Sequence, residues 1–151
     1  MTTPVLLARC PACGAKNRMP LARIGQTGKC GRCAAELPPR EFFAEAPIAV
    51  DDRRFDLITR WSGRPVLVDF WAAWCAPCRQ LAPTLEALAR ELAGRLLVVK
   101  VDTQEAPVLA ARFGVQSIPT LVLLRSGIEV DRMAGALPLT AIRARVERFL
   151  S

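Results

Sequence analysis

All six cysteines of this 151-residue chain fall into three C-x-x-C pairs, Cys10–Cys13, Cys30–Cys33 and Cys75–Cys78. In a reducing compartment, such pairs are typical of metal sites and redox centres rather than of structural disulfides. The first two pairs are separated by 16 residues, and the third lies near the middle of the chain. The pattern therefore predicts two separate sites of thiol chemistry.

The N-terminus does not resemble a signal peptide, because the apolar run at residues 5–8 is too short and Cys10 follows at once. No apolar stretch approaches the ~20 residues that a membrane-spanning helix needs. We therefore expect a cytoplasmic protein without membrane contact. The apolar fraction of 52% and the charged fraction of 23% are typical of a globular domain.

The net charge is +7 and is spread along the chain without a dense basic run. A basic balance can indicate nucleic-acid binding, but dispersed arginines favour solvated faces. Residues 1–37 contain no aromatic side chain on which bases could stack. We therefore expect no nucleic-acid partner.

Residues 38–47 contain three prolines and separate a cysteine-rich front part from a regularly patterned second part. Such proline clusters mark connecting segments. We predict a front module over residues 1–37, a linker over residues 38–47 and a second domain over residues 48–151.

The second domain alternates between apolar runs, which predict strands, and segments with leucines at helical spacing, which predict helices. Strands are expected at residues 48–50, 65–71, 96–101, 120–124 and 128–133, and helices at residues 51–61, 75–93, 106–113 and 139–150. Asp51 or Asp52 is expected to cap the first helix. Pro83 is expected to kink the second helix, which Gly94 ends. This order predicts an α/β fold with helices on both faces of a sheet that ends in an antiparallel hairpin.

Cys75 and Cys78 fall between a predicted buried strand and a predicted helix. Unpaired N–H groups and the helix dipole favour a thiolate at a helix N-terminus, lowering a thiol pKa from ~8.5 towards ~7 or below. Pro77 suits the first helical turn. We expect Cys75 to attack a substrate disulfide and the less exposed Cys78 to resolve the mixed disulfide. A metal knuckle or two inert core thiols are the alternatives.

Residues 48–151 resemble thioredoxins along their whole length. The resemblance is carried by the runs Val68–Trp71, Trp74–Cys78, Val99–Asp102, Phe113–Val115 and Ser117–Thr120, together with Gly127 and Gly135. With the front cysteines included, the chain is similar to the zinc-ribbon (thioredoxin 2 type) branch of bacterial thioredoxins. The resemblance implies a thioredoxin fold, with a central mixed sheet between helices, preceded by a small Cys₄ zinc-ribbon module.

Asp69 stands in an apolar strand, where a charge is costly unless it is neutralised or paired. The resemblance implies that Asp69 relays protons to and from Cys78, with Lys100 of the neighbouring strand as its partner. A purely structural ion pair is the alternative.

The resemblance also implies a substrate-binding surface around the redox pair. Pro119 resembles the family's cis-proline, and Ile118–Pro119 is the one plausible cis bond of that type here. The backbone of Ile118 is expected to pair with an extended substrate segment. Trp74 resembles the exposed active-site tryptophan, Ala76 and Pro77 complete the surface, and Trp71 is expected to pack.

Two residues depart from the usual family pattern. Ala76 follows Cys75 where thioredoxins usually have glycine, and Ala73 stands where proline or a glutamate-like residue is common. Residues between the cysteines tune the potential. We nevertheless expect a potential nearer to about −270 mV than to the roughly −120 mV of strong oxidants.

The front pairs Cys10–Cys13 and Cys30–Cys33 have the spacing of a tetrahedral zinc site. Gly14 and Gly31 are expected to form tight turns that point N–H groups at sulfur. About 35 residues cannot build a stable core alone, so metal is expected to supply much of the folding energy. Iron, or disulfides without metal, are the alternatives.

The resemblance implies a protein-disulfide reductase that an NADPH-dependent thioredoxin reductase recharges, and we expect a monomer. No G-x-G-x-x-G or phosphate-binding loop is present, so no organic cofactor is expected. One alternative is a disulfide isomerase or oxidase of the same fold. Others are a zinc-ribbon binding module with the second domain as scaffold, and a redox switch in which oxidation ejects zinc.

Overall fold

The computed structural model describes residues 5–39 and 42–150, and its centre is a five-stranded sheet of order β10-β9-β7-β8-β6. The strands are β6 (Ile48–Ala49), β7 (Val66–Trp71), β8 (Leu97–Asp102), β9 (Thr120–Arg125) and β10 (Ile128–Ala134). β6, β7 and β8 run parallel, whereas β9 is antiparallel to both β7 and β10. The sheet is therefore mixed, with the predicted hairpin at one edge.

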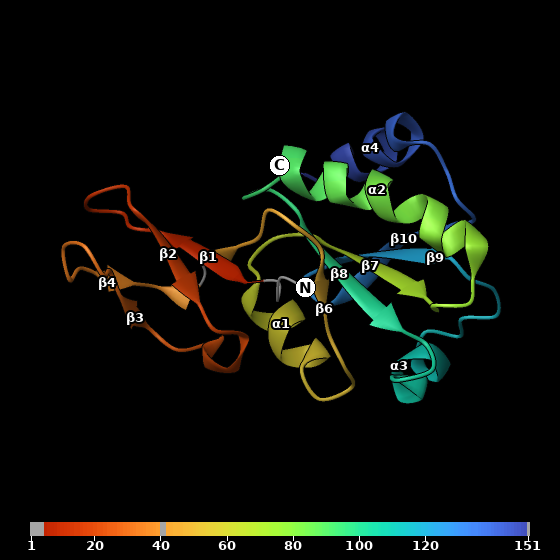
Figure 1. Cartoon of the computed structure of the whole chain (residues 1–151), viewed down its shortest axis with the longest axis horizontal. Coiled ribbons are helices and arrows are strands. Elements are labelled where there is room, and N and C mark those ends of the chain that lie inside the picture. The colour runs from red at the N-terminus through yellow and green to blue at the C-terminus, as the bar shows by residue number, and fades with distance from the viewer. Residues whose placement is uncertain (1–4, 40–41, 151) are drawn as a thin grey trace.

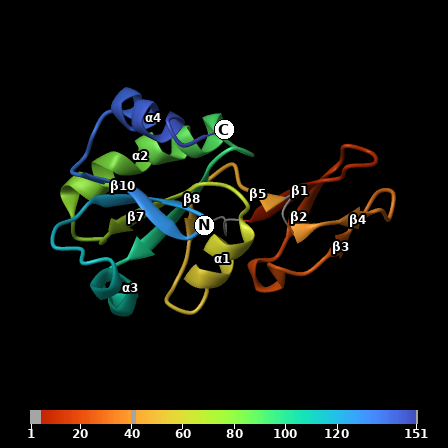
Figure 2. The same cartoon turned by 180° about the vertical axis from the view of Figure 1, so that it is seen from behind.

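Helices cover both faces of this sheet, as the sequence predicts (Figures 1 and 2). The two on one face are α2 (Ala76–Glu91) and α4 (Leu139–Glu147), and the two on the other are α1 (Phe55–Trp61) and α3 (Pro107–Arg112). Leu81, Leu85 and Leu88 of α2 share one apolar cluster with Ile142 and Val146 of α4. This cluster fastens the helix that carries the redox pair to the sheet.

Helix α1 begins later than predicted, at Phe55. The Oδ1 of Asp51 accepts hydrogen bonds from the N–H groups of Arg53 and Arg54 at 3.1 and 3.0 Å, so a turn precedes the helix. The Oδ1 of Asp52 instead accepts from the N–H of Leu109 at 3.1 Å and ties this loop to α3. The N-cap of α1 is Arg54, which makes no side-chain cap hydrogen bond, so the prediction that Asp51 or Asp52 caps this helix is wrong, and Asp51 instead stabilises the turn before it.

Helix α2 runs through Pro83 without ending there. It ends at Glu91, and the chain turns at Gly94, whose φ is +87°. The last helix ends at Glu147, before the predicted limit at residue 150. In the described part of the chain, no helix combines the length and apolar character needed to cross a bilayer.

The front of the chain forms a three-stranded sheet of order β2-β1-β5 and a two-stranded sheet of β3 and β4. Its elements are β1 (Leu6–Arg9), β2 (Lys16–Met19), the 3-10 helix η1 (Leu21–Arg23), β3 (Gly28–Lys29), β4 (Glu36–Leu37) and β5 (Phe42–Phe43). β5 lies in the segment predicted as a linker and pairs antiparallel with β1. Residues 42–43 therefore extend the sheet of the front module.

The front module packs on the second domain through a shared apolar core. One cluster contains Leu6 and Phe42 from the front part together with Ile48 and Phe55 from the second. Arg64, from the loop between α1 and β7, donates a hydrogen bond to the carbonyl of Phe42. The module lies at one end of the molecule, and the C-terminal end of β7 lies at the other (Figures 1 and 2).

Candidate redox and metal sites

Cys75 and Cys78 are joined by a disulfide at the junction of β7 and α2, with 5.3 Å between their Cα atoms. Cys75 is the N-cap of α2, and its Sγ accepts a hydrogen bond from the backbone N–H of Cys78 at 3.2 Å. Pro77 occupies the first turn, where its missing N–H leaves no hydrogen bond unmade. The pair thus lies at the helix start that the sequence predicts.

Both cysteines are 3% exposed, so the predicted difference in exposure between them is absent from this disulfide. Their surroundings differ instead. Cys78 begins the inward face of α2 that Leu81 and Leu85 continue. Cys75 precedes the helix, and its Sγ lies 3.8 Å from the carbonyl oxygen of Ile118.

The surface beside the pair carries Trp74, which is 65% exposed, next to the exposed residues Ala76 and Pro77. The Nη1 of Arg79 donates a hydrogen bond to the carbonyl of Ala73 at 2.7 Å and so braces the loop that presents Trp74. Sequence reasoning did not select Arg79, because an arginine directly after the motif gives no sign of this contact.

The Ile118–Pro119 peptide bond is cis, as the resemblance implies. Pro119 is buried, and its carbonyl accepts a hydrogen bond from the N–H of Gly135 at 3.0 Å. The Oγ1 of Thr120 donates to the carbonyl of Ser117 at 2.6 Å. These contacts fix the loop ahead of β9 and place the carbonyl of Ile118 beside Cys75.

Asp69 is 1% exposed, and its Oδ1 has no hydrogen-bond partner among the described residues. Side chains alternate along a strand, so Asp69 shares its face of β7 with Leu67, which packs with Leu81 of α2. Asp69 therefore lies on the face of the sheet that α2 and Cys78 cover. Burial raises its pKa to about 7, against the opposing effect of the positive charge of Lys100.

Lys100 is the register partner of Asp69 on β8. Its Nζ, however, lies 4.4 Å from the ring centroid of Trp71, a cation–π arrangement. Lys100 thus influences Asp69 through its charge, while its side-chain contact is with Trp71. The sequence could not separate these arrangements, because both place the lysine beside the aspartate.

The four front cysteines converge, with all four Sγ atoms within 4.8 Å of one another. The close contacts run between the pairs: Cys10 to Cys33 at 3.5 Å and Cys13 to Cys30 at 3.6 Å. Four sulfurs at ~2.3 Å from a tetrahedral Zn²⁺ are about 3.8 Å apart. The donor set and its spacing therefore fit the predicted zinc ion.

Each knuckle has a residue of positive φ directly after its second cysteine. Gly14 has a φ of +77°, but its counterpart in the second knuckle is Ala34, at +64°, and not Gly31. The N–H groups that point at sulfur belong to Cys13 and Arg32, at 3.4 Å from Cys10 and Cys30 respectively. Gly31 lies in the second turn as predicted, and Gly14 follows the first turn with a positive φ.

Hydrogen bonds prepare two of the thiols for ionisation. The N–H of Cys13 lowers the pKa of Cys10. The side chain of Asn17 is the leading cause that lowers the pKa of Cys30 to about 6. Metal binding needs thiolates, so these two cysteines are the readiest ligands, whereas, against a backbone hydrogen bond that lowers it, contacts with the other three thiols raise the pKa of Cys33 to about 12 in the metal-free protein.

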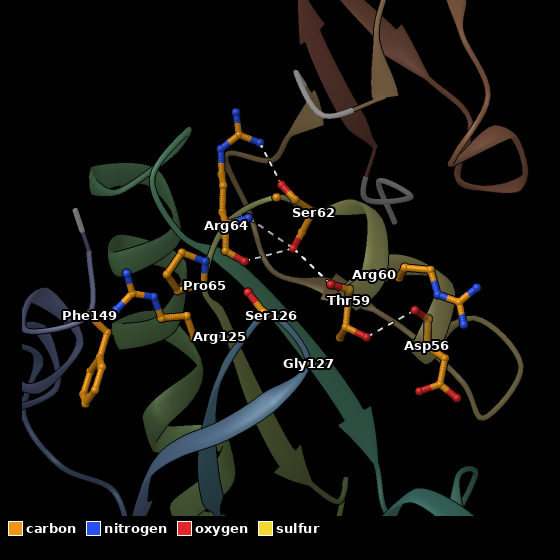
Figure 3. Close-up of a pocket in the computed structure, with 11 residues that line it drawn as sticks. Asp56, Thr59, Arg60, Ser62, Arg64, Pro65, Arg125, Ser126, Gly127 and Phe149 are labelled. Atoms are coloured by element: carbon orange, nitrogen blue, oxygen red, sulfur yellow. Dashed lines mark hydrogen bonds between the residues drawn. The ribbon is translucent and has the colours of Figure 1, made fainter.

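A hollow of about 490 Å³ lies between α1, the loop to β7 and the β9–β10 turn (Figure 3). The Oγ of Ser62 donates to the carbonyl of Arg64 at 2.9 Å, and the carboxylate of Asp56 pairs with Arg112 at 2.8 Å. None of the predicted site residues lines this hollow. It therefore adds nothing to the thiol chemistry.

A disulfide at the start of the helix that follows a central parallel strand, beside a cis-proline loop, defines a thiol–disulfide oxidoreductase. Residues 46–148 match the family model "Thioredoxin", and residues 9–35 match "Thioredoxin 2, N-terminal". The chain belongs to the thioredoxin family and carries an N-terminal zinc ribbon. Its activity is that of a protein-disulfide reductase.

Known proteins similar to this chain agree with that assignment. Thioredoxin C-3 of Corynebacterium nephridii is 41% identical over 85% of this chain and 84% of its own length. Thioredoxin 1 of a Nostoc species is 43% identical over 70% of this chain and 98% of its own. A solved mutant thioredoxin from Halobacterium salinarum superimposes with a TM-score of 0.66 at 33% identity, covering 71% of this chain and 93% of that one.

Proposed function

We propose that this protein is a monomeric cytoplasmic reductase of protein disulfides that an NADPH-dependent thioredoxin reductase recharges. The observation that carries the proposal is the Cys75–Cys78 disulfide at the start of α2, beside the Ile118–Pro119 loop. We further propose a front module over residues 1–37 and a redox domain over residues 48–151, joined by residues 38–47, whose strand β5 adds to the sheet of the front module. We propose no nucleic acid and no membrane among the partners. The substrates would be proteins that present an extended segment to this surface.

In the first step, the Cys75 thiolate attacks one sulfur of the substrate disulfide. A bond forms between Cys75 and that sulfur, the substrate disulfide breaks, and the departing sulfur keeps the electron pair and then takes a proton. The N–H of Cys78, which faces the Sγ of Cys75 at 3.2 Å, supports the thiolate form of Cys75. The backbone of Ile118 and the exposed ring of Trp74 hold the substrate segment.

In the second step, Cys78 gives up its proton, and its thiolate attacks the Sγ of Cys75. The internal disulfide forms, the mixed disulfide breaks, and the second substrate sulfur leaves as a thiolate. Two electrons have then passed from the dithiol to the substrate. Asp69 accepts the proton of Cys78, because its pKa of about 7 leaves it able both to take up and to release a proton near neutrality.

In the front module, the thiolates of Cys10, Cys13, Cys30 and Cys33 would hold one structural Zn²⁺. When bound, the ion would supply folding energy to a module of small sheets. The front module lies at one end of the molecule and the start of α2 at the other (Figures 1 and 2), which supports a structural role for the ion and not a part in the disulfide exchange.

The test is Cys75→Ser, with Cys78→Ser as its matched control. Without the attacking thiol, reduction of a protein disulfide such as that of insulin should fall by at least about 10³-fold. Cys78→Ser should instead trap substrate as a mixed disulfide that mass spectrometry detects. Undiminished reduction by Cys75→Ser would refute the mechanism.

The equilibrium potential separates the reductase from its closest rival. Emission of Trp71 and Trp74, which adjoin the pair, can follow oxidation against a series of glutathione ratios. We expect a value near about −270 mV, and a value above about −200 mV would favour an isomerase or oxidase.

A further inference from the structure

The two metal-binding knuckles have nearly the same backbone. In each, the N–H of the first cysteine donates to the carbonyl five residues later, from Cys10 to Ala15 and from Cys30 to Ala35, both at 2.8 Å. The knuckles differ at the residue after the first cysteine, which is Pro11 in one and Gly31 in the other. Pro11 has no N–H, whereas Gly31 has one that needs an acceptor.

That acceptor is the side chain of Asn17, in strand β2 next to the first knuckle. Its Oδ1 accepts the N–H of Gly31 at 2.9 Å. Because a backbone N–H can only donate, this bond fixes the orientation of the amide and turns its NH₂ group the other way. A Cβ at position 31 would lie 3.7 Å from the same Oδ1, an ordinary van der Waals contact, so this hydrogen bond depends on the backbone N–H and not on the absence of a side chain.

The NH₂ group of Asn17 reaches both knuckles. Its Nδ2 lies 3.3 Å from the carbonyl oxygen of Ala15, at the end of the first knuckle, and 3.5 Å from the Sγ of Cys30, in the second. It also lies 3.5 Å from the carbonyl of Ala8 in β1. One half-buried side chain thus connects two strands, two knuckles and one sulfur.

We propose that Asn17 is a positioning residue of the zinc site, which holds the second knuckle against the first and directs an N–H at the Cys30 sulfur. A bound ion gathers four thiolates, and a donor aimed at one of them offsets part of that negative charge. Mutation of a residue that hydrogen-bonds to a metal ligand typically lowers metal affinity by about 10–100-fold. The proposal rests on the zinc-binding role of the four cysteines.

The test compares Asn17→Ala with Arg18→Ala in the full chain. Arg18 is the exposed neighbour on the same strand and makes a matched control. Zinc affinity is measured by competition with a chromophoric chelator, using Zn²⁺ alone as the probe. Asn17→Ala should bind Zn²⁺ about 10–100-fold more weakly than the wild type, and Arg18→Ala should stay within about twofold of it.

Asn17→Asp serves as a second variant that keeps the acceptor for Gly31. It replaces the NH₂ donor by a charged oxygen facing the sulfurs, so it should bind Zn²⁺ at least as weakly as Asn17→Ala. In the Co²⁺-substituted protein, the sulfur-to-cobalt charge-transfer bands of both variants should shift or weaken, because the Cys30 sulfur loses its donor.

The outcomes separate the two levels of the proposal. If the wild type takes up no Zn²⁺, the metal-binding role itself fails. If the wild type binds Zn²⁺ and Asn17→Ala matches it within twofold, the role of Asn17 alone is refuted. Unchanged sulfur-to-cobalt charge-transfer bands in both variants would likewise refute it, since these bands report on the Cys30 sulfur that the NH₂ group of Asn17 faces.

Discussion

The same C-x-x-C spacing has two local structures in this molecule. Cys75 is followed directly by a 16-residue helix with Pro77 in its first turn, and the two sulfurs of this pair bond to each other. In each knuckle, a residue of positive φ, Gly14 or Ala34, follows the second cysteine, and the close sulfur contacts run to the opposite knuckle. The comparison teaches that residues around the cysteines, not their spacing, decide between redox exchange and metal binding.

Removal of zinc should cause the largest difference in folding between the front module and the redox domain. Structural zinc sites in small peptides supply about 10–16 kcal/mol of apparent binding energy at neutral pH. Stripping the ion with a chelator should therefore unfold residues 5–37, while strands β7, β8 and β9 stay folded. Hydrogen exchange followed by mass spectrometry measures both parts in one experiment.

A peroxide-treated sample, compared with the chelator-stripped one, tests the redox-switch hypothesis. The knuckles and the redox pair lie at opposite ends of the molecule, so disulfide reduction should stay within about twofold after peroxide-driven zinc loss. Kinetics that change more than this would support the switch. Unchanged hydrogen exchange in residues 5–37 would show that zinc does not fold the module.

Replacement of the buried carboxylate of Asp69 tests how the redox site affects stability. The pKa of Asp69 is about 7 in the folded protein against 3.8 for an unperturbed group, so the folded state retains a proton that the unfolded state releases between these values. Wild-type stability should therefore fall as pH rises from about 4 to about 7 and stay low above that.

Asp69→Asn cannot titrate and should avoid this loss. It should exceed the wild type by up to about 4 kcal/mol at pH 8, since each pKa unit is worth about 1.4 kcal/mol, and match it near pH 4. Urea unfolding at the two values measures the difference. The variant should also resolve mixed disulfides more slowly at pH 7. An equal stability gain at both pH values would contradict a raised pKa.

Much of this molecule follows from its sequence because local and tertiary signals agree. Continuous apolar runs predicted β7, β8 and β9, since a strand buried on both faces needs no polar alternation. The redox pair was found because its strand, its proline and its helix start all surround the two cysteines. The zinc ligands followed from two C-x-x-C pairs at a separation that is typical of zinc sites.

What the sequence did not reveal depends on contacts between distant segments. Lys100 packs on Trp71, and Asp52 accepts a hydrogen bond from the N–H of Leu109 in α3. Both contacts depend on tertiary packing, which the sequence pattern does not specify. Asn17 stands in a Lys-Asn-Arg run that is typical of a solvated strand, so nothing in the pattern pointed to sulfur. Likewise, nothing in the sequence predicts the positive φ of +64° at Ala34.

Arg79 offers a smaller test of the redox side. Arg79→Ala removes the hydrogen bond to Ala73 and a positive charge near Cys75, an exposed contact worth about 1 kcal/mol. The value of kcat/KM should fall roughly fivefold, at about 1.4 kcal/mol per factor of ten. The pKa of the Cys75 thiol, followed by thiolate absorbance, should rise. Arg79→Lys keeps the charge and should restore the thiol pKa. If the wild type, Arg79→Ala and Arg79→Lys have the same kcat/KM and the same thiol pKa, Arg79 has no part in the site.

The smallest effect tests the knuckles against each other. Ala34 has a φ of +64°, in the left-handed region that costs a non-glycine residue about 1–2 kcal/mol. Ala34→Gly removes this cost but loses roughly 0.5–1 kcal/mol to the greater freedom of glycine in the unfolded chain. The zinc-loaded protein should therefore gain about 0.5–1 kcal/mol in chemical denaturation.

Gly14→Ala is the mirror experiment in the first knuckle. A Cβ at Gly14 would meet no atom within 4 Å, so its φ of +77° is the only source of strain. This variant should lose about 0.5–1 kcal/mol, and the double variant Gly14→Ala with Ala34→Gly should return to the wild-type value. Opposite signs in the two single variants would establish that the knuckles are conformational equivalents, whereas equal signs would mean that their turns are held by different forces.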